Sequence, residues 1–64
     1  MEKAEATAGL VKEEINASIY LKEILKKGLI NYSALAREML PKVRAVNNKA
    51  NFSSVLIAIQ RYYD

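Results

Sequence analysis

Apolar residues recur at helical spacing in three stretches of this chain. The first stretch, residues 16–27, has an apolar face made of Ala17, Leu21, Ile24 and Leu25, which Ile19 and Tyr20 widen. Spacings of three and four place such residues on one side of an α-helix. Gly28 follows, where a left-handed residue commonly ends a helix. The pattern therefore predicts a helix from about Asn16 to Lys27.

The second stretch begins after a short hydrophobic connector. Either Asn31 or Ser33 can cap a helix there, because a short side-chain oxygen accepts from a free amide of the first turn. The apolar stripe that follows consists of Leu35, Ala36, Met39, Leu40, Val43 and Val46. Pro41 lies inside the stripe, and an internal proline removes a backbone donor and clashes with the preceding turn. We expect a kink or two abutting helical segments there.

The third stretch follows a polar segment, residues 47–51, whose composition predicts a loop. Either Asn51 or Ser53 can cap the helix after it. The apolar positions of this helix are Phe52, Val55, Leu56, Ile59, Tyr62 and Tyr63. The stripes of the last two helices together predict a core made of Leu35, Met39, Leu40, Leu56 and Ile59.

Residues 1–14 are prone to form helix but are weakly patterned, and Thr7 and Gly9 favour fraying. We expect a flexible or partner-ordered N-terminal leader over residues 1–14, with a helical extension as the alternative. Residues 15–64 then form the domain. The predicted fold is all-α, a three-helix, helix-turn-helix-like bundle.

A chain of 64 residues makes one small domain with a marginal core. It contains no cysteine and no histidine, so neither a disulfide nor a zinc site is expected to support that core. Small scaffolds often gain stability by association. We therefore expect a homodimer, or a complex with a protein partner.

Charge is unevenly distributed along the sequence. Residues 1–19 contain two lysines and four glutamates, a balance of −2, whereas residues 20–64 contain eight basic and three acidic residues, a balance of +5. A basic helical region is compatible with nucleic acid, although solvated lysines are an equally good interpretation. No apolar run suits a membrane span, and the first residues do not resemble a signal peptide, so we expect a cytoplasmic protein.

Catalysis is not predicted. Histidine and cysteine, the usual bases and nucleophiles, are absent, and the carboxylates are scattered. No glycine-rich phosphate loop is present. The sequence therefore favours a protein that is not an enzyme and that has no catalytic residue, metal site or cofactor.

Duplex DNA is the partner that the last helix suggests. In helix-turn-helix domains this helix enters the major groove. A stripe of small or polar residues, Asn51, Ser54, Ala58 and Arg61, runs opposite the apolar face. We predict that Ser54 and Arg61 face bases and that Lys42, Arg44 and Lys49 contact phosphates. The alternative is a dimerisation or interaction module that does not bind nucleic acid, since a small-residue face also suits contact between helices. The spacing of the last two helices also exceeds that of the tight motif.

Part of the sequence resembles a segment of uncharacterised, mostly archaeal regulatory proteins. The resemblance is carried by residues 30–37, by Pro41 and by residues 55–62. In that family a short, winged-helix-like segment precedes an ACT-type regulatory domain. The resemblance covers residues 19–63 and implies a helical regulatory module with no active site to carry over. The sequence departs from the family in lacking an ACT domain before its end at Asp64, and in beginning the last helix with Asn51-Phe-Ser-Ser instead of acidic residues.

Overall fold

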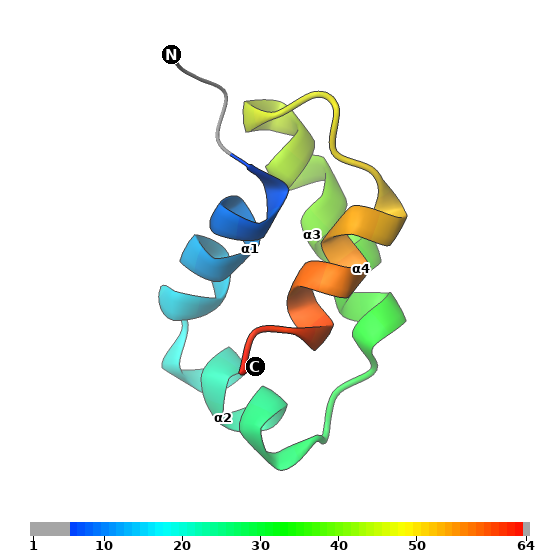
Figure 1. Ribbon diagram of the computed structural model, residues 1–64. Coiled ribbons are helices and arrows are strands. Elements are labelled where there is room, and N and C mark those ends of the chain that lie inside the picture. The colour runs from blue at the N-terminus through cyan, green and yellow to red at the C-terminus, as the bar shows by residue number, and fades with distance from the viewer. Residues whose placement is uncertain (1–5, 64) are drawn as a thin grey trace.

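Four α-helices and no strand make up residues 6–63, the part of the chain that the computed structural model describes. In chain order these are α1 (Thr7–Asn16), α2 (Ile19–Lys27), α3 (Tyr32–Val46) and α4 (Phe52–Gln60), as Figure 1 shows. The radius of gyration, 11.2 Å, is close to the ~11 Å expected for a folded chain of this length. The all-α prediction is confirmed. The described residues form four helices, and the first of them, α1, corresponds to the N-terminal helical extension that was the alternative to a flexible leader.

Side-chain caps define where the last three helices begin. The Ser18 hydroxyl accepts from the Leu21 amide at 3.2 Å, and Asn31 Oδ1 accepts from the Ala34 amide at 3.0 Å. Asn51 starts α4. Gly28, at φ 70°, ends α2 in the left-handed conformation that glycine adopts without strain. Of the predicted alternatives, Asn31 and Asn51 are therefore the caps.

The predicted helix from Asn16 to Lys27 is wrong at its beginning. Asn16 is the last residue of α1, and the chain turns at Ala17 before α2 starts at Ile19. Ser18 is extended (φ −128°, ψ 107°), because its hydroxyl caps the next helix. A capping serine between two apolar stretches separates them into two helices.

Helix α3 is one uninterrupted helix across Pro41. The alternative of two abutting segments is therefore wrong. Pro41 lies on the exposed side of the helix, while Met39 and Val43 on the other side are buried. The apolar packing of that face offsets the loss of the backbone hydrogen bond.

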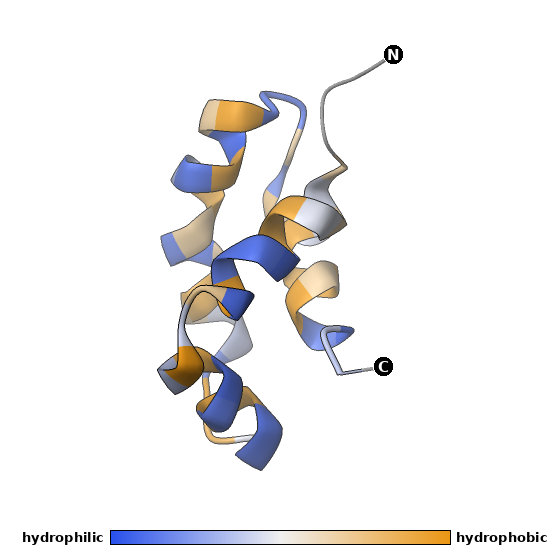
Figure 2. Ribbon diagram, turned by 90° about the vertical axis from the view of Figure 1, so that its left-hand side faces the viewer, coloured by the Kyte–Doolittle hydropathy of each residue, from blue (hydrophilic) through white to orange (hydrophobic). Residues whose placement is uncertain are grey.

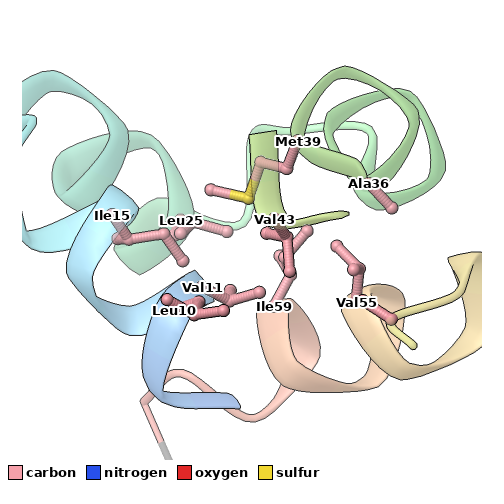
Figure 3. Close-up of a cluster of buried hydrophobic side chains, with 10 residues drawn as sticks. Leu10, Val11, Ile15, Leu25, Ala36, Met39, Val43, Val55 and Ile59 are labelled. Atoms are coloured by element: carbon pink, nitrogen blue, oxygen red, sulfur yellow. The ribbon is translucent and has the colours of Figure 1, made fainter. Parts of the chain in front are cut away.

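All four helices contribute to the core, where their buried side chains meet (Figure 3). Its buried members are Leu10, Val11, Ile15, Leu25, Ala36, Met39, Val43, Ala50, Val55 and Ile59. Of the five predicted core residues, Met39 and Ile59 are confirmed. Leu35, Leu40 and Leu56 are only half-buried and pack against the core from its edge.

The predicted N-terminal leader, residues 1–14, contains most of α1, a helix that contributes to the core. Leu10, Val11 and Ile15 of α1 are 7%, 1% and 0% exposed, so the expected domain boundary at residue 15 is wrong for residues 7–14. The expectation for residues 1–5 lies outside the described residues. Burial of three aliphatic side chains outweighs the low helix propensity of Thr7 and Gly9.

Helix α1 packs against each of the other helices, and α4 packs against both α1 and α3. Helix α2 packs on α1 at one end of the molecule, and the C-terminal end of the chain returns close to it (Figure 1). Figure 2 shows hydrophobic and hydrophilic residues alternating around the helices, and a hydrophilic connection between α3 and α4. The arrangement places α1 at the centre and α2 at the periphery.

Candidate functional site

The five residues predicted to bind nucleic acid line three different hollows in the surface. Lys42 lies beside α1, where its ammonium approaches a Glu14 carboxylate at 3.9 Å. Both side chains are well exposed, so the pair contributes little to stability. Glu13 lines the same hollow. Carboxylates beside Lys42 weaken its attraction for a phosphate.

Arg44 and Lys49 line a second hollow, at the end of α3. Its volume is about 300 Å³, and residues 44–49 surround it. The Asn47 side chain accepts from the Lys49 amide at 3.1 Å and shapes the turn. Arg44 and Lys49 are thus the two predicted phosphate-binding residues that the fold brings together.

Ser54 is occupied in capping α4. Its amide donates to Asn51 Oδ1 at 2.9 Å, and its hydroxyl accepts from the Asn51 amide at 3.1 Å. The same hydroxyl is within 2.9 Å of the Asn51 carbonyl oxygen, to which it can donate. The reciprocal contacts form a capping box, and they leave Ser54 poorly placed to read a base.

The small residues of α4 face α1. Ser54 and Ala58 are half-buried, while the exposed side of α4 carries Ser53, Ile57, Gln60 and Arg61. Of the predicted stripe, Ser54 and Ala58 are half-buried beside α1, whereas Asn51 and Arg61 are exposed.

A groove of about 390 Å³ lies between α1 and α4. We call it the α1–α4 groove, and its lining residues are Thr7, Ala8, Lys12, Ser54, Ile57, Ala58, Arg61 and Tyr62. Among the described residues that line the groove, two are cations, Lys12 and Arg61, and none is acidic. Of the predicted site residues it includes Ser54 and Arg61. The α1 side was missed, because residues 7–12 were assigned to the leader.

The groove continues towards the C-terminus of α1. A further hollow of about 330 Å³ is lined by Lys12, Asn16, Tyr62 and Tyr63, and it shares Lys12 and Tyr62 with the groove. The Tyr62 hydroxyl donates to Asn16 Oδ1. This hydrogen bond joins the ends of α1 and α4.

Tyr63 connects the C-terminal turn to α2. Its hydroxyl donates to the Lys22 carbonyl oxygen at 2.8 Å, and its ring meets that of Tyr62 edge-on, with the centroids 4.8 Å apart. Partial desolvation raises the pKa of the Tyr63 phenol above its usual value, and nearby Tyr62 and Glu23 raise it further. The neutral phenol therefore helps to hold α2 to the C-terminal turn.

Helix α2 exposes two large apolar side chains in its first turn. Ile19 is 76% exposed and Tyr20 is 72% exposed. We call these two residues the α2 knob. Glu23, four residues after Ile19, lies on the same side of the helix and is also exposed. The knob and the groove offer a convex and a concave apolar surface on one molecule.

Within residues 6–63, no three acidic side chains gather closely enough to hold a metal ion. No helix in the same range is long and apolar enough to cross a membrane.

No known protein family, curated protein or solved structure matches this chain. The resemblance of residues 19–63 to the helical segment of ACT-domain regulatory proteins therefore stays a prediction.

Proposed function

We propose that this domain is a protein-interaction module that associates with a second copy of itself. The observation that carries the proposal is the α2 knob, whose Ile19 and Tyr20 are both more than 70% exposed. Single exposed apolar residues are common on protein surfaces, whereas larger contiguous apolar patches are typical of contact surfaces. Their burial in a complex is favourable in water.

The small size of the core supports the same proposal. The largest fully buried side chains are Ile15, Ile59, Val11, Val43 and Val55, and no aromatic residue is among the buried core. A core of aliphatic residues in a chain this short leaves little margin of stability. Association adds to that margin, because it acts only on the folded state.

The distribution of cations also favours association over nucleic-acid binding. Lys42 lies beside Glu14, Arg44 and Lys49 line another hollow, and Arg61 lines the α1–α4 groove. A nucleic-acid surface gathers its cations along one face to follow the phosphate backbone.

Sedimentation equilibrium over a wide range of protein concentration tests the proposal. The average mass should rise from monomer towards dimer or beyond. Ile19→Ser combined with Tyr20→Ser should weaken association by roughly 100-fold or more, since burial of each large apolar side chain contributes about 1.5–3 kcal/mol. Val46→Ser, which changes another exposed apolar residue, is the matched control. A monomeric mass up to high micromolar concentration contradicts the proposal.

The second candidate is a regulatory module that binds duplex DNA, with α3 and α4 as a helix-turn-helix-like pair. Arg44 and Lys49, which lie together beside the α3–α4 connection, support it. If this alternative is right, Lys49→Ala weakens binding to all DNA sequences. It also reduces the slope of the logarithm of the binding constant against the logarithm of the salt concentration by about 1. Arg61→Ala instead relaxes the preference for particular sequences. A titration at low salt, where phosphate contacts are strongest, decides. Absence of binding there excludes this candidate and leaves self-association untouched.

A further inference from the structure

We propose that the α1–α4 groove binds a small amphipathic anion, an apolar chain that ends in a carboxylate. Neither residue of the α2 knob lines the groove, so the proposal does not depend on self-association. Three observations carry it: the volume of the groove, the small side chains that open it, and the two cations in its lining.

The size of the groove suits a small molecule. Its volume is about 390 Å³, within the range of roughly 300–1,000 Å³ that is typical of small-molecule sites. The adjoining hollow of about 330 Å³ shares Lys12 and Tyr62 with it, so the two hollows meet at these residues. An elongated ligand can therefore lie along α1.

Small side chains leave room between α1 and α4, which run in the same direction (Figure 1). Ala8 lines the groove from α1, and Ser54 and Ala58 line it from α4. Ile57, which is 49% exposed, adds an apolar wall. The groove can therefore shield an apolar chain from water, which is favourable.

Two polar groups of the lining are already used within the fold. The Ser54 hydroxyl belongs to the capping box of α4, and the Tyr62 hydroxyl donates to Asn16. The two cations differ from them, because neither Lys12 nor Arg61 forms an ion pair with another of residues 6–63. A negative charge on the ligand therefore finds partners that no described residue occupies.

Lys12 is the stronger of the two partners. It precedes the last turn of α1, where the partial negative charge of the helix end is concentrated. Arg61 is the C-cap residue of α4, so free carbonyl groups beside it offset part of its charge. A carboxylate placed at Lys12 leaves its apolar chain to lie over Ala8 and Ala58.

An NMR titration at a protein concentration that keeps the domain monomeric tests the proposal. Octanoate, kept below its micelle concentration, should shift the amide signals of residues 7–12 and 54–62 and reach saturation. Octylamine has the same chain and the opposite charge, so it should bind at least about fivefold more weakly. Acetate lacks the chain and should not saturate. Equal affinity for octanoate and octylamine, or largest shifts at Ile19 and Tyr20, overturns the proposal.

Substitutions separate the role of charge from that of the apolar chain. Lys12→Gln should weaken octanoate binding about threefold to fivefold, whereas Lys49→Gln, at an exposed cation outside the groove, should have no effect. Ala58→Leu should weaken it about tenfold or more, because the larger side chain excludes methylene groups of the ligand. Ala34→Leu, on an exposed part of α3, is the control for added bulk.

Circular dichroism checks that each variant folds. The Lys12 side chain is exposed, so Lys12→Gln tests the proposal even where Ala58→Leu disturbs the packing of α4 on α1. Octanoate binding that is unchanged by Lys12→Gln overturns the proposal and leaves self-association untouched.

Discussion

Helices α1 and α2 are neighbours in sequence and have nearly equal length, yet they occupy opposite environments. Helix α1 buries Leu10, Val11 and Ile15 and packs against every other helix. Helix α2 buries only Leu25 and leaves its first turn in water, with Ile19 and Tyr20 exposed. One helix stabilises the fold, and the other offers a contact surface.

The comparison shows that a clear amphipathic pattern does not decide which helix enters the core. Helix α2 has the more regular apolar face and a favourable placement of Lys26 and Lys27 in its last turn. Helix α1 has a capping residue, Ala6, whose side chain makes no capping hydrogen bond. What places α1 in the core is the fit of its aliphatic residues between α3 and α4.

The largest expected difference in unfolding free energy is between a substitution at the buried Ile15 and one at the exposed Ile19. Ile15→Ala should cost about 2–5 kcal/mol of unfolding free energy, because Ile15 is 0% exposed and its removal leaves a cavity. Ile19→Ala should change the stability of the monomer by less than about 0.5 kcal/mol. Chemical denaturation at low protein concentration measures both. Equal losses for the two variants would break the comparison.

A smaller effect is expected where α2 ends. Gly28→Ala should cost about 1–2 kcal/mol, since an alanine Cβ disfavours the left-handed conformation at φ 70°. Beyond the two adjacent residues, no described atom lies within 4 Å of that Cβ, so the expected loss comes from backbone strain. Gly28→Asn is the control and should lose less, because asparagine tolerates this conformation better. An unchanged midpoint for Gly28→Ala would show that α2 ends differently.

The smallest expected effect on stability concerns the hydrogen bond from the Tyr63 hydroxyl to the Lys22 carbonyl oxygen of α2. The folded-state pKa of Tyr63 is above its usual value of 10.0, so the stability that this group contributes is present below that pH and is lost as pH rises through the raised pKa. Thermal melts in alkaline solution should therefore depend less steeply on pH for Tyr63→Phe than for the parent chain. Identical pH profiles would show that the phenol does not hold α2.

Much of the fold could be predicted from the sequence. The apolar stripes that begin at Leu35 and Phe52 predicted two helices. Their caps were predicted as Asn31 or Ser33 and as Asn51 or Ser53, and the structure uses the two asparagines. Ser18 was a signal of the same kind, but the apolar pattern on both sides of it favoured one continuous helix. At such positions the apolar spacing favours one continuous helix, whereas a capping residue favours the start of a new one. Only the packed structure shows which of the two forms.

The surface was harder to predict. The groove needs residues from α1 and α4 at once, and sequence spacing does not reveal contacts between helices so far apart in the chain. Because Thr7 and Gly9 favour fraying, sequence analysis does not place Ala8 or Lys12 in a candidate site. Arg61 was predicted to face bases, which stays a prediction, and the structure places it at the groove.

Amide hydrogen exchange at two protein concentrations tests the central claim most directly. At low concentration, the core amides of α1 should exchange slowly and those of α2 faster, because α2 buries less and opens more readily. At high concentration, protection of α2 should rise more than protection of α1, since the knob becomes covered. Equal protection of α1 and α2 at low concentration, or protection of α2 that is independent of concentration, would contradict the division into a core helix and a contact helix.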